Sequence, residues 1–188
     1  MSESGPLEDL DRAIGVAAEV VAGVRPDQWT AATPCTELDA RELLDHMVTG
    51  NLLFTALLRG AAPPDRAADH LGDDPAGAFR AASAGLTEAF AAPGALERTY
   101  TAPFGTGPGI ALLQVRVVEM LVHGWDLARA TGQDADFPDD VAARALVASR
   151  GALRAARDRP GAPFAAEVMV AEDAPAMDRL VAYLGRHP

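Results

Sequence analysis

The strongest constraint on the fold is an apolar run, residues 112–127, that is interrupted by four ionisable side chains. At about 100° per residue, Glu119 and His123 lie about 40° apart on a helix and stack one turn above the other. Arg116 and Asp126 fall near the same line, whereas leucine, valine and methionine cover the other directions. Charge on a helix that is buried on most sides is costly unless it is paired or binds a metal ion. The run therefore predicts a buried helix with one polar face.

The composition favours packed helices over sheets. Apolar residues make up 49% of the 188 residues and aromatic residues only 5%, and much of the apolar fraction is alanine, which prefers helices. This length allows one domain with a substantial core, or one domain with a small appendage. Apolar periodicity and helix start and stop signals predict helices over 6–24, 39–59, 75–91, 110–130, 138–158 and 175–184, a connection over 95–109 and a strand over 164–171.

Local signals mark several of these boundaries. Asp39 and Glu42 have the spacing of a capping box at a helix start. Gly60 and Gly132 stand where the second and fourth predicted helices end. The glycines between residues 105 and 109 lack both the Walker spacing and its lysine, so a phosphate-binding loop is rejected.

The charge pattern excludes several classes of partner and chemistry. The formal net charge is −11, and all 16 basic residues are arginines scattered along the chain. An acidic field repels phosphate backbones, so we expect no nucleic-acid partner, and the lack of lysine excludes Schiff-base catalysis. The run 112–127 carries too much charge to span a membrane. With one cysteine, Cys35, and an acidic start that lacks a secretory h-region, we expect a cytoplasmic protein.

A third candidate metal ligand, His46, lies in the second turn of another predicted helix. Antiparallel pairing of that helix with the apolar run would place His46 level with His123. Together with Glu119, the two imidazoles would form a set typical of zinc sites that keep coordination positions open. His70, in an acidic loop, and His187, near the last residue, are weaker candidates.

The same residues also allow a purely structural interpretation. Glu119 can pair with Arg116, and His123 can bond Asp126, without any metal. If a metal is bound, Asp126 can instead orient His123 or serve as the general base of a hydrolytic site. Cys35 is interpreted as a small buried loop residue, as free cysteines usually are.

Two strings of residues, in this order, carry a family resemblance. The first is Thr33-Pro34-Cys35-Thr36-Glu37-Leu38-Asp39, followed by Asp45-His46-Met47 and Gly50-Asn51. The second is Glu119-Met120-Leu121-Val122-His123-Gly124-Trp125-Asp126-Leu127-Ala128. Together they resemble the mycothiol-dependent maleylpyruvate isomerase family of the DinB/YfiT-like superfamily. The segment 173–186 is similar to an actinobacterial subgroup of metal-binding proteins in that family.

The resemblance implies a mainly all-α protein. Residues 1–135 would form a DinB/YfiT-like four-helix bundle, and residues 136–188 a short helix and strand extension packed on it. The metal ligands would be His46, Glu119 and His123, the metal a divalent ion, zinc above all, and mycothiol the co-substrate. Residues 136–188 are shorter than the C-terminal domain of the characterised isomerases, so maleylpyruvate itself is not assigned as the substrate.

The implied function is that of a mycothiol-dependent S-transferase or isomerase in which the metal activates a thiol toward an electrophile. The alternatives are a non-catalytic metal-binding, sensor or interaction protein on the same bundle, and a bundle without metal. Arg116 and Asp126 are the remaining candidates for a catalytic role, and no residue is assigned to bind the thiol. We expect a monomer or a homodimer.

Overall fold

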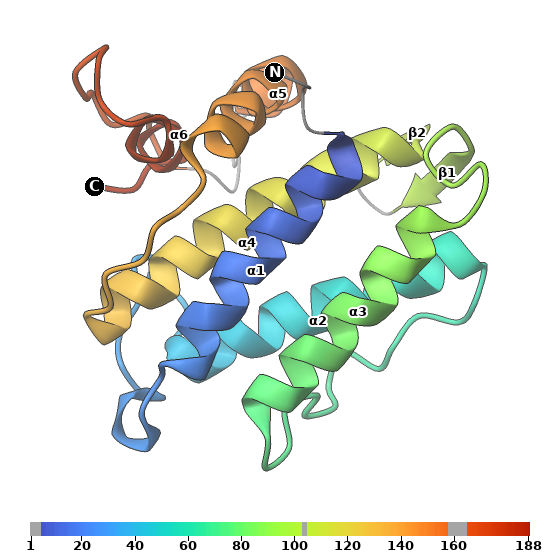
Figure 1. Ribbon diagram of the computed structural model, residues 1–188, viewed down its shortest axis with the longest axis horizontal. Helices are drawn as coiled ribbons and strands as arrows, with labels where there is room; N and C mark the ends of the chain where they lie inside the picture. The colour runs from blue at the N-terminus through green and yellow to red at the C-terminus, as the bar shows by residue number, and fades with distance from the viewer. Residues whose placement is uncertain (1–4, 103–104, 158–164) are drawn as a thin grey trace. The chain divides into compact units, whose positions relative to one another are not determined.

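The computed structural model describes residues 5–102, 105–157 and 165–188. The chain divides into two compact units, residues 1–135 and 136–188. The first unit contains α1 (Pro6–Ala22), the short 3-10 helix η1 (Pro26–Gln28), α2 (Ala40–Arg59), α3 (Pro75–Ala91), β1 (Thr99–Ala102), β2 (Gly105–Pro108) and α4 (Gly109–Thr131) (Figure 1). The second unit contains α5 (Asp139–Arg157) and α6 (Ala176–Tyr183). None of the described helices has both the length and the apolar character that a membrane span requires.

The four long helices of the first unit close around one core. α1 packs against α3 and α4, and α2 packs against the same two helices from the other side. α2 and α4 run in opposite directions (Figure 1), so the start of α2 lies beside the end of α4. The largest fully buried apolar side chains come from all four helices: Leu10, Leu43, Leu44, Met47, Phe79, Leu86, Phe90, Leu113, Met120, Leu121 and Leu127. This confirms the helical bundle that the apolar periodicity predicts.

The predicted bounds of α2 and the predicted end of α4 are confirmed by their caps, whereas α1 ends at Ala22, two residues before the predicted end. The Asp39 side chain accepts from the backbone N–H of Glu42 (2.9 Å), and the Glu42 carboxylate accepts from the N–H of Asp39 (2.9 Å). Gly60 and Gly132 end α2 and α4 in the left-handed conformation, with φ of 65° and 67°. Only glycine adopts this conformation without a steric penalty.

Two predicted segments differ in the structure. The connection 95–109 contains an antiparallel hairpin, in which Thr99 of β1 pairs with Pro108 of β2. The strand predicted over 164–171 is wrong for residues 165–171, which form no strand, and Phe164 lies outside the described residues. A strand needs a neighbouring strand, whereas here Val168 donates its N–H to the carbonyl of Ala182 near the end of α6 (2.9 Å).

The second unit is held together by contacts between its two helices. The backbone N–H of Met177 at the start of α6 donates to the Asp139 carboxylate (3.1 Å). The Arg150 guanidinium of α5 lies over the Tyr183 ring of α6, 5.6 Å from its centroid. That this unit packs on the bundle stays a prediction.

Candidate metal centre

The two predicted histidine ligands meet between α2 and α4. The ring centroids of His46 and His123 are 5.1 Å apart, and the rings stand edge to face at 87°. The two histidines are far apart in the sequence, but α2 and α4 pack antiparallel and so bring them to the same height in the bundle. The structure thus brings two imidazoles to one point, as the helix pattern predicts, while the binding of a metal there stays a prediction.

Glu119 lies on the same face of α4 and is engaged by Arg116. Arg116 Nη1 donates to Glu119 Oε2, which is the ion pair that the structural interpretation of the sequence expects. Glu119 shares the lining of one pocket with His46, and 30% of its side chain is exposed. Within the described chain Oε1 has no hydrogen-bond or ion-pair partner. One carboxylate oxygen is therefore held in place and the other remains available as a ligand.

Arg116 is a fully buried cation with several fixed partners. Its exposed fraction is 1%, and Nη2 donates to Asn51 Oδ1 (2.7 Å) and to the carbonyl of Met47 (3.3 Å). Burial lowers the pKa of the guanidinium, and Glu119 opposes this by raising it. The Asn51 amide in turn donates to Ser83 Oγ on α3 (3.1 Å). This hydrogen-bonded chain orients the guanidinium toward Glu119.

The sequence interpretation missed Asn51 and Ser83 as parts of this site. Both are buried polar residues, with exposed fractions of 0% and 3%. The available signal was an asparagine in the apolar face of a predicted helix, because such a residue must find hydrogen-bond partners inside the protein. Which partners it finds depends on how three helices meet.

Gly50 provides the space for the guanidinium. A Cβ at this position would lie 2.6 Å from Arg116 Nη1. We expect Gly50→Ala to destabilise the fold, because displacing a side chain held by three partners costs about 1–3 kcal/mol, whereas the gain in helix propensity is about 1 kcal/mol. The measurement is the free energy of unfolding in urea.

A matched control is Gly15→Ala, in the middle of α1. A Cβ there would meet nothing within 4 Å, so the same substitution is expected to stabilise the protein by about 0.5–1 kcal/mol. Equal shifts for the two variants would contradict the role given to Gly50.

His123 is oriented by Asp126. The distance between His123 Nδ1 and Asp126 Oδ2 is 3.1 Å, and Asp126 is completely buried. A carboxylate at Nδ1 favours the tautomer that carries its proton there, which leaves the Nε2 lone pair for a metal. The contact was predicted from the i, i+3 spacing.

We expect Asp126→Asn to lower zinc affinity about 10- to 100-fold, the usual effect of losing the partner of a metal-binding histidine. The amide keeps the shape but cannot stabilise the same tautomer as a carboxylate does. Competition with a chromophoric chelator measures the change. An unchanged affinity would show that Asp126 does not orient a ligand.

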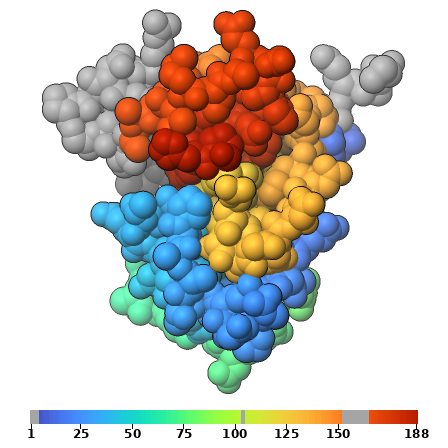
Figure 2. Space-filling view, turned by 90° about the vertical axis from the view of Figure 1, so that its left-hand side faces the viewer, coloured from blue at the N-terminus to red at the C-terminus, as the bar shows by residue number. Residues whose placement is uncertain are grey.

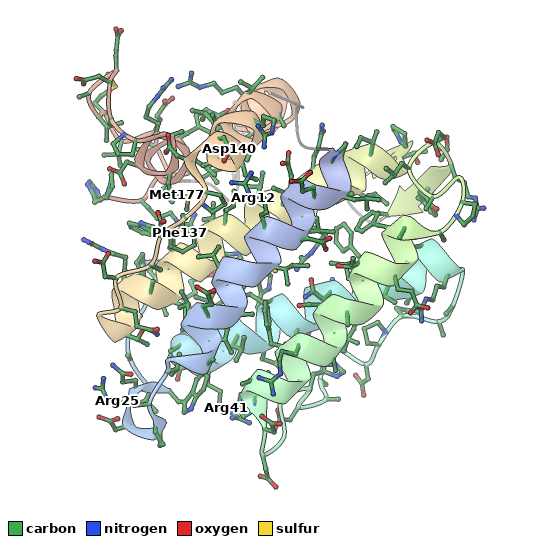
Figure 3. All side chains as sticks on the ribbon, viewed as in Figure 1. Arg12, Arg25, Arg41, Phe137, Asp140 and Met177 are labelled. Carbon is green, nitrogen blue, oxygen red and sulfur yellow. The ribbon has the colours of Figure 1, made fainter. Side chains whose placement is uncertain are left out.

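The His46 side is open to a pocket of about 720 Å³. α2 contributes Arg41 and His46 to its wall, α4 contributes Arg116 and Glu119, and the loop 61–74 contributes Arg66. Arg41, labelled in Figure 3, donates to Asp69 Oδ2 (3.1 Å) and to the carbonyl of Gly72 (3.2 Å). These bonds fix the loop against the first turn of α2, so that it forms a wall of the pocket.

The environment of His46 favours its neutral form. The pKa of His46 is lowered, first by partial desolvation of the ring and second by the nearby His123, while Glu119 acts in the opposite direction. Metal ions bind the neutral imidazole. A lowered pKa therefore keeps His46 competent as a ligand to a lower pH than an ordinary histidine.

Cys35 lies beside His123 and Asp126 of α4. The sequence interpretation did not predict this proximity. The Cys35 sulfur, a ring nitrogen of His123 and a carboxylate oxygen of Asp126 all lie within 4.8 Å of one another. The Gln28 side chain donates to the carbonyl of Thr131 (2.7 Å) and ties the loop before α2 to the end of α4. Figure 2 shows this loop, in blue, beside the yellow-orange end of α4.

Comparison with known proteins gives these residues a family context. Residues 10–128 match the family described as the mycothiol maleylpyruvate isomerase N-terminal domain. Two proteins from strains of Mycobacterium tuberculosis, MT0763 and Rv0738, are each 36% identical over 181 residues, which cover 96% of this chain and 97% of theirs. Both are described as uncharacterized.

Two crystal structures are similar in fold. They are the mycothiol-dependent maleylpyruvate isomerase and a histidine-to-alanine mutant of it, each with a TM-score of 0.60. The sequence identities are 17% and 16%, and the match covers 78% of this chain and 70% of theirs. The predicted DinB-like helical fold is confirmed.

Proposed function

Because this chain belongs to the mycothiol maleylpyruvate isomerase N-terminal domain family, we propose that it is a divalent-metal-dependent enzyme that uses mycothiol in S-transfer or thiol-assisted isomerisation. The observation that carries the proposal is the pairing of His46 and His123, 5.1 Å apart, at a pocket that Glu119 also lines. The two relatives at 36% identity have no assigned activity, so the reaction is inferred from the site.

The donor set fits a zinc-like cation. His46, His123 and Glu119 would supply two imidazole nitrogens and one carboxylate oxygen, the composition of zinc sites that keep a position open for substrate. A divalent cation held there would supply Lewis acidity that lowers the pKa of a thiol and favours the reactive thiolate. The pairing of Glu119 Oε2 with Arg116 supports this set, because it fixes the carboxylate while leaving Oε1 available.

Charge balance supports an anionic reactant. Two neutral imidazoles and one carboxylate offset only one of the two positive charges of such a cation, so an anion is attracted to the remaining position. Arg66 adds a further positive charge at the pocket wall and has no polar partner among the described residues. We propose that Arg66 contacts an anionic group of the electrophile or of the thiol.

The pocket can hold a small-molecule thiol and its acceptor. Its volume of about 720 Å³ falls within the usual range for ligand sites, about 300–1,000 Å³. Leu53 and Phe54 supply apolar wall, and the same pocket is lined by polar and charged residues, among them Arg41, His46 and Arg66. This arrangement suits a reaction between a polar thiol and a compact electrophile.

The proposal is tested by incubating zinc-loaded protein with mycothiol and monochlorobimane and following adduct fluorescence. We expect turnover above the uncatalysed rate, and a loss of about 100-fold or more in His46→Ala, because removing Lewis-acid assistance costs several kcal/mol in the transition state. Turnover that survives the loss of His46 would contradict the proposal.

His187→Ala is the matched control. His187 is exposed in the second unit, and its removal is expected to leave the rate unchanged. Zinc binding that depends on His46 but gives no thiol chemistry with a panel of electrophiles would favour the alternative, a non-catalytic metal-binding or sensor protein.

A further inference from the structure

The most compact group of metal donors in the described chain is one that the proposed function does not use. Cys35 Sγ, a ring nitrogen of His123 and a carboxylate oxygen of Asp126 lie within 4.8 Å of one another, and no other three such side chains among the described residues form a group this tight. We propose that Cys35, His123 and Asp126 form a second metal-binding set for a thiophilic divalent cation, alternative to the set that contains His46 and Glu119.

The donor types and spacing suit zinc. Thiolate, imidazole and carboxylate are all zinc ligands, with bonds of about 2.0–2.3 Å, so donor atoms around a tetrahedral ion lie about 3.5 Å apart. The three donor atoms are at most 4.8 Å apart, so each must move by less than about 1 Å to reach this spacing. Rotation of the Cys35 side chain about its Cα–Cβ bond moves the sulfur by more than that, so the helix need not shift.

Charge and burial favour a cation at this point. Asp126 is completely buried, the His123 side chain is 13% exposed, and Cys35 is half-buried. A thiolate and a carboxylate together offset both charges of a divalent ion, and a neutral set costs less to bury than a charged one. On binding, the S–H bond breaks, the proton passes to solvent, and the sulfur–metal bond forms.

The loop that carries Cys35 is fixed in a turn over the end of α4. The backbone N–H of Leu38 donates to the carbonyl of Cys35 (2.8 Å), and the Thr33 hydroxyl donates to the carbonyl of Leu38 (2.7 Å). With Gln28 bonded to Thr131, the loop is attached to α4 independently of any metal. The thiol is therefore held near His123 before a cation arrives.

The two sets compete for one side chain. A neutral imidazole has a single lone pair. His123 can therefore bind a metal ion together with Cys35 and Asp126, or together with His46 and Glu119, but not both at once. An ion bound by Cys35 would remove His123 from the proposed catalytic set. The second set does not depend on the proposed function, because its other ligands are different.

Cobalt(II) titration of the full chain tests the inference. A cobalt–thiolate bond gives a near-ultraviolet charge-transfer band that nitrogen and oxygen ligands do not give. We expect this band in His46→Ala, which lacks a ligand of the competing set, and its loss when Cys35→Ser or Asp126→Asn is added to that variant. Since Cys35 is the single cysteine of the chain, the rate of iodoacetamide labelling measures occupancy of the same site, and zinc is expected to slow the labelling at least tenfold in His46→Ala.

Two results would overturn the inference. One is His46→Ala that shows no charge-transfer band with cobalt and unchanged labelling of Cys35 with zinc, which would leave no metal site at Cys35. The other is a band that disappears in His46→Ala, which would make Cys35 an extra ligand of that set. Circular dichroism establishes that each variant is folded, and His46→Gln removes the same ligand if His46→Ala does not fold.

Discussion

Replacement of His123 by alanine is expected to abolish divalent-metal binding, with a loss of zinc affinity of about 1,000-fold or more. His123 lies beside His46 and is bonded to Asp126, so it belongs to every donor set that this end of the bundle can form. Removing a partner that only orients a ligand costs about 10- to 100-fold, and removing the ligand itself must cost more. Competition with a chromophoric chelator of known affinity measures the loss.

His70→Ala is the control for this prediction. His70 bonds the carbonyl of Asp65 within the loop 61–74 (2.8 Å) and belongs to neither donor set, so zinc affinity should stay within about twofold, since surface changes of this kind are nearly neutral. Wild-type affinity in His123→Ala would show that the metal, if bound, lies elsewhere in the chain.

The second large effect concerns stability. We expect Glu119→Gln to lower the free energy of unfolding of chelator-treated protein by about 3 kcal/mol, because it leaves a buried cation without its countercharge. Arg116 is only 1% exposed, and its other polar partners, Asn51 and the carbonyl of Met47, are neutral. Urea denaturation followed by circular dichroism measures the change.

Glu88→Gln is the matched control. It breaks the ion pair between Glu88 and Arg59 (2.7 Å), whose side chains are 79% and 48% exposed. Exposed pairs contribute about 0–1 kcal/mol. The double variant Arg116→Met, Glu119→Gln should recover part of the loss, because it removes the buried cation as well. A loss in Glu119→Gln no larger than in Glu88→Gln would contradict the role given to Arg116.

Features that depend on neighbouring residues could be predicted from the sequence. The capping box of Asp39 and Glu42 and the left-handed Gly132 satisfy backbone groups within a few residues. The bonds of Glu119 to Arg116 and of His123 to Asp126 follow from a spacing of three on one helix. Helical periodicity also predicted that His46 and His123 lie on facing surfaces.

Features that depend on how the elements meet could not be predicted. Asn51 reaches Arg116 and Ser83 only because α2, α3 and α4 converge. The approach of Cys35 to His123 depends on the path of the loop before α2. The hairpin β1–β2 was missed because its strands are four residues long and rich in glycine and threonine. The strand expected near Val168 does not form, and the N–H of Val168 bonds the end of α6 instead of a neighbouring strand.

The proposed function depends above all on one divalent metal ion held by His46, Glu119 and His123 at the pocket. The most direct measurement is an anomalous-difference map from a crystal of zinc-loaded protein, recorded at the zinc absorption edge. We expect a peak within bonding distance of the two imidazoles and the Glu119 carboxylate, about 2.0–2.2 Å from each donor atom. A zinc-loaded crystal with no peak there, or with its only peak at Cys35, would contradict this metal site.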